Sequence, residues 1–290
     1  MNRIICATDY SENSITALKY AYSISKKLNT NLMVTHVFNF PALLKIEFEE
    51  NFIDNEKETY KQQHLKLKKF CILHLGDDLD EMNVTIEVIE NSSAFKGIIS
   101  KADEIKAFMI VVGIKGTNIL KEVMGSTTRQ LINKAPCLVL AIPEYIIYKE
   151  IETIVYATDF EAEADIEVIK KLSKIAKAFK AKIQVVHITT EKEYEVESQM
   201  DLFKDKLKKK VDYENIKFKI LVSDDVFNTL RMYLEEIEAD IVVMLEREKR
   251  GLLSKLFHGD LVKKMETYGK LPLLSFNEDN FGEFYFIDFY

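Results

Sequence analysis

The feature that most constrains the fold of this chain is a sequence repeat shared by its two halves. Residues 4–10, IICATDY, recur at 154–160 as IVYATDF. An apolar segment at 32–37, LMVTHV, recurs at 183–188 as IQVVHI, so the offset changes only from 150 to 151 residues. Ordered matches that stay almost in register indicate two copies of one domain, joined near residues 143–151.

The repeat continues through the later segments of each half. Amphipathic, helix-like stretches follow the first strand of each copy, at 17–28 and at 166–179. Further apolar segments recur in the same order, at 84–89 and 216–222, at 109–112 and 241–244, and at 136–142 and 272–276. Strand and helix alternate, and the strands lack period-two polarity, which is typical of a parallel sheet covered on both faces. We therefore predict an α/β fold of two tandem Rossmann-like domains, each a five-stranded parallel sheet with helices on both faces.

The repeat also sets the expected domain boundaries. We place the first domain at residues 1–145, the second at 150–277, and an aromatic C-terminal tail at 278–290. The aromatic residues of the tail are Phe281, Phe284, Tyr285, Phe286, Phe289 and Tyr290. Because so many rings are costly to leave in water, we expect the tail to pack on its own polypeptide or on a partner copy.

Composition and charge exclude several classes of protein. The 290 residues are 47% hydrophobic and 30% charged, with a net charge of -7 and interspersed signs, whereas a nucleic-acid surface needs a basic face. The N-terminus turns polar too soon for a signal peptide, and no apolar run reaches membrane-spanning length. The three cysteines show no metal spacing, and Cys6 and Cys137 lie in apolar runs as small core residues. We expect a cytoplasmic protein with no nucleic-acid, membrane or metal site.

A candidate ligand-binding segment follows the fourth strand of the first half. The apolar run 108–112 ends on Gly113, Gly116 follows, and Gly125-Ser126-Thr127 has the composition of a helix start. Glycine allows close approach to a ligand, and a helix N-terminus offers unpaired N–H groups and partial positive charge. This order of elements predicts an anion site of phosphate size, with a plain glycine turn as the alternative.

The predicted topology gives this segment two neighbours. In open parallel sheets, ligands bind beyond the carboxyl ends of the strands at the point where the strand order reverses. That edge of the first half brings together Thr8-Asp9 after the first strand, Val37-Phe38 at the end of the second, and the glycine segment after the fourth.

These residues together resemble the universal stress protein family. The resemblance is carried by Ala7-Thr8-Asp9-Tyr10-Ser11, by His36-Val37, by Gly113-x-x-Gly116 with Gly125-Ser126, and by Ala135-Pro136-Cys137-Leu138-Val139-Leu140. It covers most of the chain as two tandem domains. It implies that residues 138–142 and 273–276 pair within one chain as an intramolecular pseudo-dimer, and that two chains can associate further as a homodimer.

The resemblance also implies a site for ATP or another adenine nucleotide in the first domain, with or without magnesium. Asp9 and the backbone of Val37 would hold the adenine, and Gly113 would approach the ribose. The phosphates would lie in a cradle of Gly116, Gly125, Ser126 and Thr127. The full set of expected nucleotide-binding residues is Ala7, Thr8, Asp9, Val37, Val112, Gly113, Lys115, Gly116, Gly125, Ser126 and Thr127.

The glycine segment departs from the family pattern in both halves. ATP-binding members have nine residues between the second and third glycines, whereas the first half of this chain has eight, 117–124. The loop either absorbs this deletion or draws Gly116 away from the phosphates, because hydrogen-bond geometry is narrow. In the second half, residues 245–250 hold no glycine, and Asp260 follows Gly259 where the family has a hydroxyl. Carboxylates repel phosphate, so we predict that the second domain does not bind ATP in the family manner.

Other polar residues have structural explanations. His36 and His187 occupy matching positions in apolar strands, which favours hydrogen-bonded core histidines over catalytic bases. The charged stretch 56–75 predicts a long amphipathic helix. Its expected inner-face residues are Leu65, Leu67, Phe70 and Leu73. No Ser-His-Asp or Cys-His set and no carboxylate pair points to catalysis, so we expect at most slow nucleotide hydrolysis.

Three functional hypotheses follow. The leading one is a tandem universal stress protein that binds one adenine nucleotide and acts as a stress-linked sensor or adaptor. The second is an interaction or dimerisation module of the same fold that binds no nucleotide, which the shortened loop favours. The third is an enzyme that hydrolyses an adenine nucleotide, against which the missing catalytic set argues.

Overall fold

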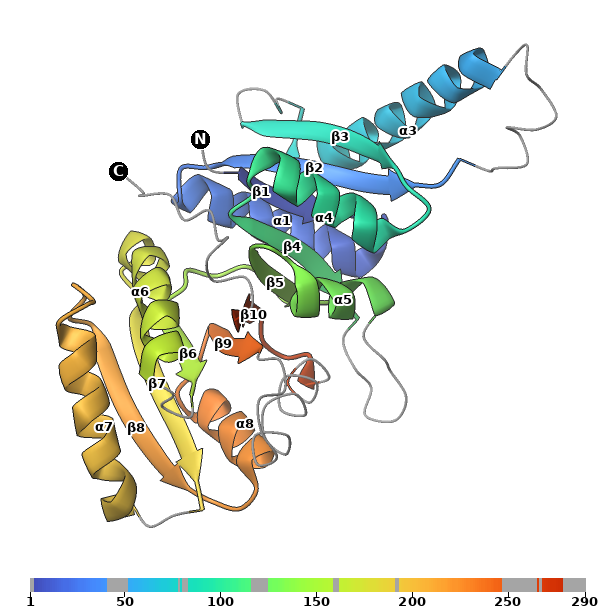
Figure 1. Cartoon of the computed structure of the whole chain (residues 1–290). Helices are drawn as coiled ribbons and strands as arrows, with labels where there is room; N and C mark the ends of the chain where they lie inside the picture. The colour runs from blue at the N-terminus through green and yellow to red at the C-terminus, as the bar shows by residue number, and fades with distance from the viewer. Residues whose placement is uncertain are drawn as a thin grey trace.

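The computed structural model describes residues 3–40, 52–77, 79, 83–115, 125–158, 162–190, 193–246, 265 and 268–278. Strands and helices alternate along the chain, as the repeat predicts (Figure 1). The elements of the first half are β1 Arg3–Ala7, α1 Glu12–Lys27, β2 Asn31–Phe38, α3 Phe52–Leu75, β3 Val84–Glu90, α4 Ala94–Ile105, β4 Met109–Ile114, α5 Ser126–Lys134 and β5 Leu138–Pro143. Those of the second half are β6 Thr153–Ala157, α6 Ala162–Phe179, β7 Lys182–Thr189, α7 Glu193–Lys208, β8 Ile216–Val222, α8 Val226–Glu236, β9 Ile241–Glu246 and β10 Leu273–Asn277.

The strands form one sheet in the order β3-β2-β1-β4-β5-β10-β9-β6-β7-β8. All neighbouring strands are parallel except β5 and β10, which run antiparallel with Leu273 opposite Ala141 and Ser275 opposite Val139. Each half therefore supplies five parallel strands, which confirms the predicted fold class. The two halves join through their last strands, which is the pairing that the family resemblance implies.

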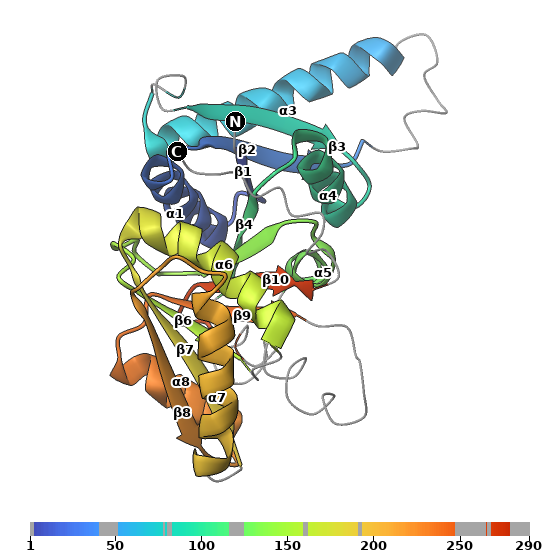
Figure 2. The same ribbon diagram turned by 60° about the vertical axis from the view of Figure 1, so that its left-hand side comes forward.

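Helices cover both faces of this sheet (Figure 2). Helices α1, α3, α6 and α7 pack on one face, and α4, α5 and α8 pack on the other. The strands serve both layers because successive side chains point to opposite faces. In β1, Ile4 and Cys6 belong to the first layer and Ile5 to the second, and all three are fully buried. This is why the strands are apolar at consecutive positions.

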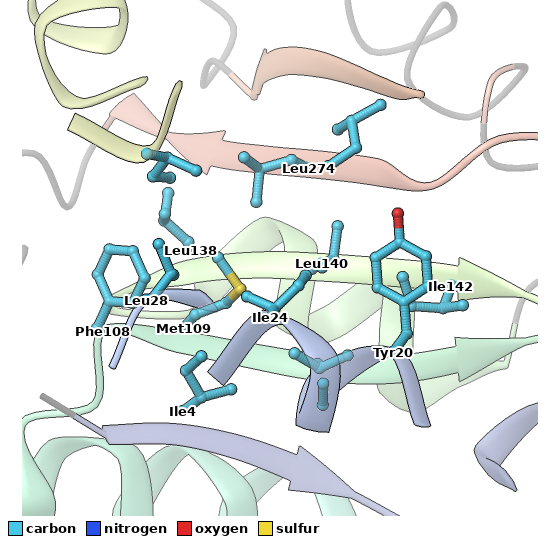
Figure 3. Close-up of a cluster of buried hydrophobic side chains, with 14 of the residues drawn as sticks. Ile4, Tyr20, Ile24, Leu28, Phe108, Met109, Leu138, Leu140, Ile142 and Leu274 are labelled. Atoms are coloured by element: carbon cyan, nitrogen blue, oxygen red, sulfur yellow. The ribbon is translucent and has the colours of Figure 1, made fainter. Parts of the chain in front are cut away.

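Both packed layers cross the boundary between the halves. Figure 3 shows Leu274 of β10 beside Leu138 and Leu140 of β5 and residues of α1. Asp240, at the start of β9, is 6% exposed and accepts hydrogen bonds from the backbone N–H groups of Glu152 and Thr153, each at 2.8 Å. Its carboxylate also lies 2.7 Å from the Nζ of Lys149. The connecting segment is thus attached to the second half by one buried carboxylate.

Helix α3 corrects one expectation about its inner face. Leu67 and Cys71 are buried and Phe70 is partly buried, but Leu65 is 47% exposed and Leu73 is 77% exposed. The buried stripe steps by three and four residues from Leu67, which places Leu65 and Leu73 on the opposite side. The N-terminal part of α3 projects beyond the sheet (Figure 1), so only its C-terminal part has a sheet to pack on.

Three sequence expectations lie outside the described residues. They concern Gly116 with the loop 117–124, the charged segment 247–250 with Gly259 and Asp260, and the aromatic tail from 279 onward. The predicted core positions of Cys6 and Cys137 are confirmed, since the two side chains are 0% and 1% exposed.

Candidate functional site

A notch opens where the central strand of the first half ends before its neighbours. Ala7, the last residue of β1, pairs with Thr35 of β2 and with Val112 of β4. Strand β2 continues to Phe38 and β4 to Ile114, so both extend past β1 at their carboxyl ends. In the strand order β3-β2-β1-β4-β5, this notch lies at the reversal point, where doubly wound sheets bind their ligands.

A cavity of about 150 Å³ occupies this position. Its walls come from the turn after β1, the start of α1, the ends of β2 and β4, the start of α4 and the first turn of α5. The lining residues are Ala7, Thr8, Asp9, Asn13, Ser14, Thr35, His36, Val37, Ala94, Ile98, Val112, Gly113, Thr127 and Thr128. The volume suits one aromatic base better than a whole nucleotide, so a longer ligand would extend outward.

The cavity brings together most of the residues expected from the sequence. Those that line it are Ala7, Thr8, Asp9, Val37, Val112, Gly113 and Thr127. Lys115, Gly125 and Ser126 lie outside the lining set and are exposed, and Gly116 is not among the described residues.

The lining residues that sequence reasoning missed are Asn13, Ser14, Thr35, His36, Ala94, Ile98 and Thr128. Asn13 and Ser14 follow Asp9 closely in the sequence, and this nearness was a signal that they could lie at the same site. Ala94 and Ile98 carry no signal, because a small apolar residue on a helix has the same pattern whether it packs on a sheet or lines a cavity.

A chain of hydrogen bonds fixes the turn at the bottom of the notch. The Tyr10 N–H donates to Thr8 Oγ1 at 3.0 Å, and the Thr8 and Ser14 hydroxyls lie 2.8 Å apart. The Ser14 hydroxyl donates to the Ser11 carbonyl at 2.8 Å, so the proton between the two hydroxyls belongs to Thr8. These bonds hold Tyr10 at a φ of 68°, in the left-handed region that a non-glycine residue rarely adopts.

Asp9 projects a carboxylate at the rim. Its Oδ1 accepts hydrogen bonds from the Ser11 N–H, at 3.1 Å, and from the Ser11 hydroxyl. Burial opposes ionisation of this carboxyl, but the hydrogen bonds to Ser11 outweigh it and hold the pKa below its usual value. Asp9 is therefore a fixed anion, suited to accept hydrogen bonds from an amino or hydroxyl group of a ligand.

His36 is oriented by the backbone of the same turn. Its Nδ1 lies 2.8 Å from the Thr8 carbonyl oxygen, which can only accept, so Nδ1 carries the proton. Its ring lies 4.4 Å from the Tyr10 ring, between centroids. Burial lowers the pKa of this imidazole. His187 makes the same bond to Thr158, also at 2.8 Å, which confirms that both histidines are hydrogen-bonded.

The backbone of Val37 faces the notch. Residues of β2 alternate their backbone groups between the two neighbouring strands. The Thr35 carbonyl accepts from the Thr8 N–H on the β1 side, whereas the Phe38 carbonyl accepts from the Asn91 N–H on the β3 side. Val37 lies two residues after Thr35, so its backbone groups also point to the β1 side. The pairing of β1 with β2 ends at Thr35, so no residue of β1 lies opposite Val37. Its N–H and carbonyl therefore point to the space where a ligand edge can replace a strand.

The two described glycines of the candidate segment have different reasons to be glycine. A Cβ on Gly113 would lie 2.3 Å from the carbonyl oxygen of Asn13 and 2.8 Å from the backbone nitrogen of Ser14. Gly113 is thus required for β4 to pack against the start of α1. A Cβ on Gly125 would meet no described atom within 4 Å, and its φ of -53° suits any residue. Among the described residues, neither packing nor backbone conformation requires glycine at position 125.

Gly125 is also the N-cap of α5. The first turn of this nine-residue helix holds no acidic residue, so its unpaired N–H groups and partial positive charge are not offset there. Thr127 and Thr128 of the same turn line the cavity. The cavity is therefore bordered by the first turn of α5 and, from other elements, by residues of β2 and α4 that include the apolar Val37, Ala94 and Ile98.

The second half repeats part of the framework of this site, with one side chain changed at the position of Thr35. The Thr158 N–H donates to the Val186 carbonyl at 2.9 Å, as Thr8 does to Thr35. Where the first half has Thr35, the second half has Val186.

Comparison with known proteins decides the family. A sequence model described as the universal stress protein family matches residues 1–143 and again residues 150–264. The chain belongs to the universal stress protein family. Its two matches are tandem universal stress protein domains, which confirms the resemblance stated from the sequence motifs.

Curated universal stress proteins match half of the chain. YxiE of Bacillus subtilis is 29% identical over 149 residues, which is 49% of this chain and 98% of that protein. A universal stress protein of Methanocaldococcus jannaschii is 27% identical over 146 residues, covering 48% of this chain and 81% of that protein. Such relatives correspond in length to one domain of this tandem chain.

Solved structures share the arrangement of the whole chain. A universal stress protein from Archaeoglobus fulgidus superposes with a TM-score of 0.69 at 16% identity, covering 96% of this chain and 98% of that one. A putative universal stress protein from Pseudomonas aeruginosa gives 0.60 at 13% identity, with 98% and 96% covered. These likenesses show a common fold.

Within the described part of the chain, none of the helices is both long and apolar enough to cross a membrane.

Proposed function

We propose that the first domain binds one adenine nucleotide in the cavity at the end of β1, and that this tandem universal stress protein acts as a nucleotide-responsive sensor or adaptor. The observation that carries the proposal is the convergence of Asp9, the Val37 backbone and Thr127 on one cavity at the reversal point of the sheet. These groups come from three segments far apart in the sequence.

The two sides of the cavity support an orientation for the ligand. The base would lie on the side of β2 and α4, with the Val37 backbone and the Asp9 carboxylate as hydrogen-bond partners for its polar edge. The phosphates would lie at the N-terminus of α5, where helix N–H groups and the absence of a side chain on Gly125 suit an anion. The ligand itself would therefore explain a glycine that nothing else in the described structure requires.

The proposed activity is binding, with at most slow hydrolysis. Phosphoryl transfer needs charge neutralisation and a positioned nucleophile. Magnesium would neutralise charge on the phosphates, but in the described part of the chain no group of three or more His, Cys, Asp or Glu residues is arranged to hold a metal ion. Any magnesium would therefore be held mainly by the nucleotide. We further propose that the second domain binds no ATP, since its glycine positions are replaced.

The test measures the nucleotide content of the freshly purified chain and its affinity for added Mg-ATP. Denaturation followed by mass spectrometry of the supernatant should release about one adenine nucleotide per chain and identify its phosphate state. Two per chain would overturn the proposal for the second domain. None, together with no heat of binding when Mg-ATP is added in a calorimeter, would overturn the nucleotide proposal.

The matched variant is Gly125→Val. A side chain at this position meets no described protein atom but would occupy the phosphate path. We expect binding of Mg-ATP to weaken at least tenfold while the circular dichroism spectrum stays that of the unaltered protein. Unchanged affinity would show that the anion does not lie at the start of α5.

An interaction module without nucleotide is the second candidate function. The observation that favours it is the loop between Gly116 and Gly125, which is one residue shorter than in ATP-binding members of the family. Under this function Gly125→Val would leave partner binding unaffected, and the purified protein would carry no nucleotide.

A further inference from the structure

Thr35 is the unusual residue of the cavity. Its side chain is 0% exposed, and its hydroxyl oxygen has no hydrogen-bond partner among the described residues. A buried hydroxyl without a partner costs about 1–3 kcal/mol, so such groups are rare in folded proteins. Thr35 also lines the cavity. The unsatisfied hydroxyl therefore belongs to a residue that borders the cavity.

Two other buried hydroxyls of the cavity, those of Thr8 and Ser14, are already engaged. Thr8 and Ser14 bond to each other, and Ser14 bonds onward to the Ser11 carbonyl. The Nδ1 of His36 is held by the Thr8 carbonyl. Thr35 differs because its hydroxyl has no hydrogen-bond partner among the described residues, although its backbone carbonyl accepts from the Thr8 N–H. Its hydroxyl is left for the cavity.

The position of Thr35 selects the part of the ligand it would meet. It lies on β2, on the same strand as Val37 and on the side of the cavity that Ala94 and Ile98 of α4 close. The α5 side of the cavity, where the proposed function places the phosphates, is formed by Thr127 and Thr128 from a different element. A nucleotide with its phosphates at α5 would thus present its base to Thr35.

We propose that the Thr35 hydroxyl hydrogen-bonds a polar atom on the base of the bound nucleotide and is a specificity-determining residue of the site. This inference rests on the proposed function. The second half supports it by contrast, because the residue equivalent to Thr35 is Val186, which has nearly the same shape but no hydroxyl. The hydroxyl is therefore present in the domain proposed to bind a nucleotide and absent from the other.

The first experiment compares Thr35→Val with the unaltered chain. Valine keeps the shape and removes the hydroxyl, so we expect calorimetry to show about 5- to 10-fold weaker binding of Mg-ATP. Thr35→Ser keeps the hydroxyl and should restore most of the affinity. The melting temperature of the ligand-free Thr35→Val protein should be equal or higher, because a buried unsatisfied group has been removed. A lower melting temperature with unchanged affinity would show a purely structural role and overturn the proposal.

The second experiment identifies the contacted atom by a double-mutant cycle. Adenosine is compared with its 1-deaza, 3-deaza and 7-deaza analogues and with purine riboside, which lacks the exocyclic amino group. For the analogue that lacks the contacted group, Thr35→Val should cause no further loss of affinity. An equal loss for all five ligands would mean that the hydroxyl does not touch the base, which overturns the proposal.

The control is Val186→Thr, which introduces the same hydroxyl at the equivalent place in the second half. It should leave the affinity for Mg-ATP unchanged and lower the melting temperature, since Val186 is 1% exposed. The failures of the two proposals are distinguishable. If the unaltered chain binds no Mg-ATP, the proposed function fails; if it binds and Thr35→Val binds equally well, only the assignment of Thr35 fails.

Discussion

At the residue scale, the candidate site depends on a neutral histidine. Burial lowers the pKa of His36, and the nearby Lys66 adds to this effect, while the Thr8 carbonyl and Asp9 oppose it. The unfolded chain, with a histidine pKa of about 6.5, then takes up a proton more readily than the folded one. The stabilising contribution of neutral His36 is therefore complete above about pH 6.5 and is lost as the pH falls through the folded-state pKa.

The corresponding prediction is a melting temperature that declines between pH 7.5 and pH 5.5. His36→Asn should make the decline shallower, because an amide N–H can still donate to the Thr8 carbonyl but does not titrate in this range. Burial also lowers the pKa of His74, so part of the slope should remain until His74→Gln is added. Identical slopes for the unaltered protein and both variants would contradict this account.

At the scale of elements, β4 and α1 approach so closely that a methyl group cannot fit between them. A Cβ at position 113 would fall 2.3 Å from a backbone oxygen of α1, which cannot move aside as a flexible side chain would. We expect Gly113→Ala to destabilise the protein by about 3 kcal/mol, roughly 6 °C in melting temperature. Gly125→Ala, at an open helix N-cap, should cost no more than about 1 kcal/mol in the same thermal melt. Equal melting temperatures for the two variants would show that β4 and α1 can separate at little cost.

Gly113 also shows what a sequence pattern can and cannot predict about the fold. The sequence predicted that the strand ends before Gly113, whereas β4 includes Gly113 and ends at Ile114. Gly113 does lie at the notch, but glycine is required there by packing against the start of α1. The strands were predictable because residues such as Ile4, Ile5 and Cys6 are apolar on both faces of the sheet. The helix start at Gly125 was also predictable, because a glycine followed by two hydroxyl residues is typical of the start of a helix.

What the sequence could not indicate was contact between distant elements. In the sequence, Thr35 has the pattern of an ordinary β-branched strand residue. Only the structure shows that the end of β1 and the start of α4 lie around it at the cavity. The inner face of α3 was mispredicted at Leu65 and Leu73 because both lie on the side of the helix opposite the buried stripe of Leu67 and Cys71. Helix α1 begins at Glu12, five residues before the amphipathic pattern, because its first turn serves the notch and not the core.

At the scale of the whole molecule, the join between β5 and β10 makes the two domains parts of one packed body. Each helix layer belongs to a hydrophobic cluster that contains residues of both halves. Leu274 of β10 is 2% exposed and pairs with Leu140 of β5 at the centre of the join (Figure 3). Separation of the halves would expose this apolar surface on both sides, so neither half is expected to unfold by itself.

This arrangement predicts one cooperative thermal transition for the entire chain. Leu274→Ala leaves a cavity in the shared core and should cost about 3 kcal/mol, shifting that single transition without splitting it. Leu202→Ala, which truncates a leucine of α7 that is 65% exposed, should change stability by less than about 0.5 kcal/mol. Differential scanning calorimetry checks both variants. Two resolved peaks, with Leu274→Ala moving only the one from the second half, would show that the domains are stable independently.

The same calorimetric scan can be repeated with Mg-ATP. If Mg-ATP raises the midpoint temperature of the single peak without splitting it, a ligand in the first domain stabilises the second through the shared core.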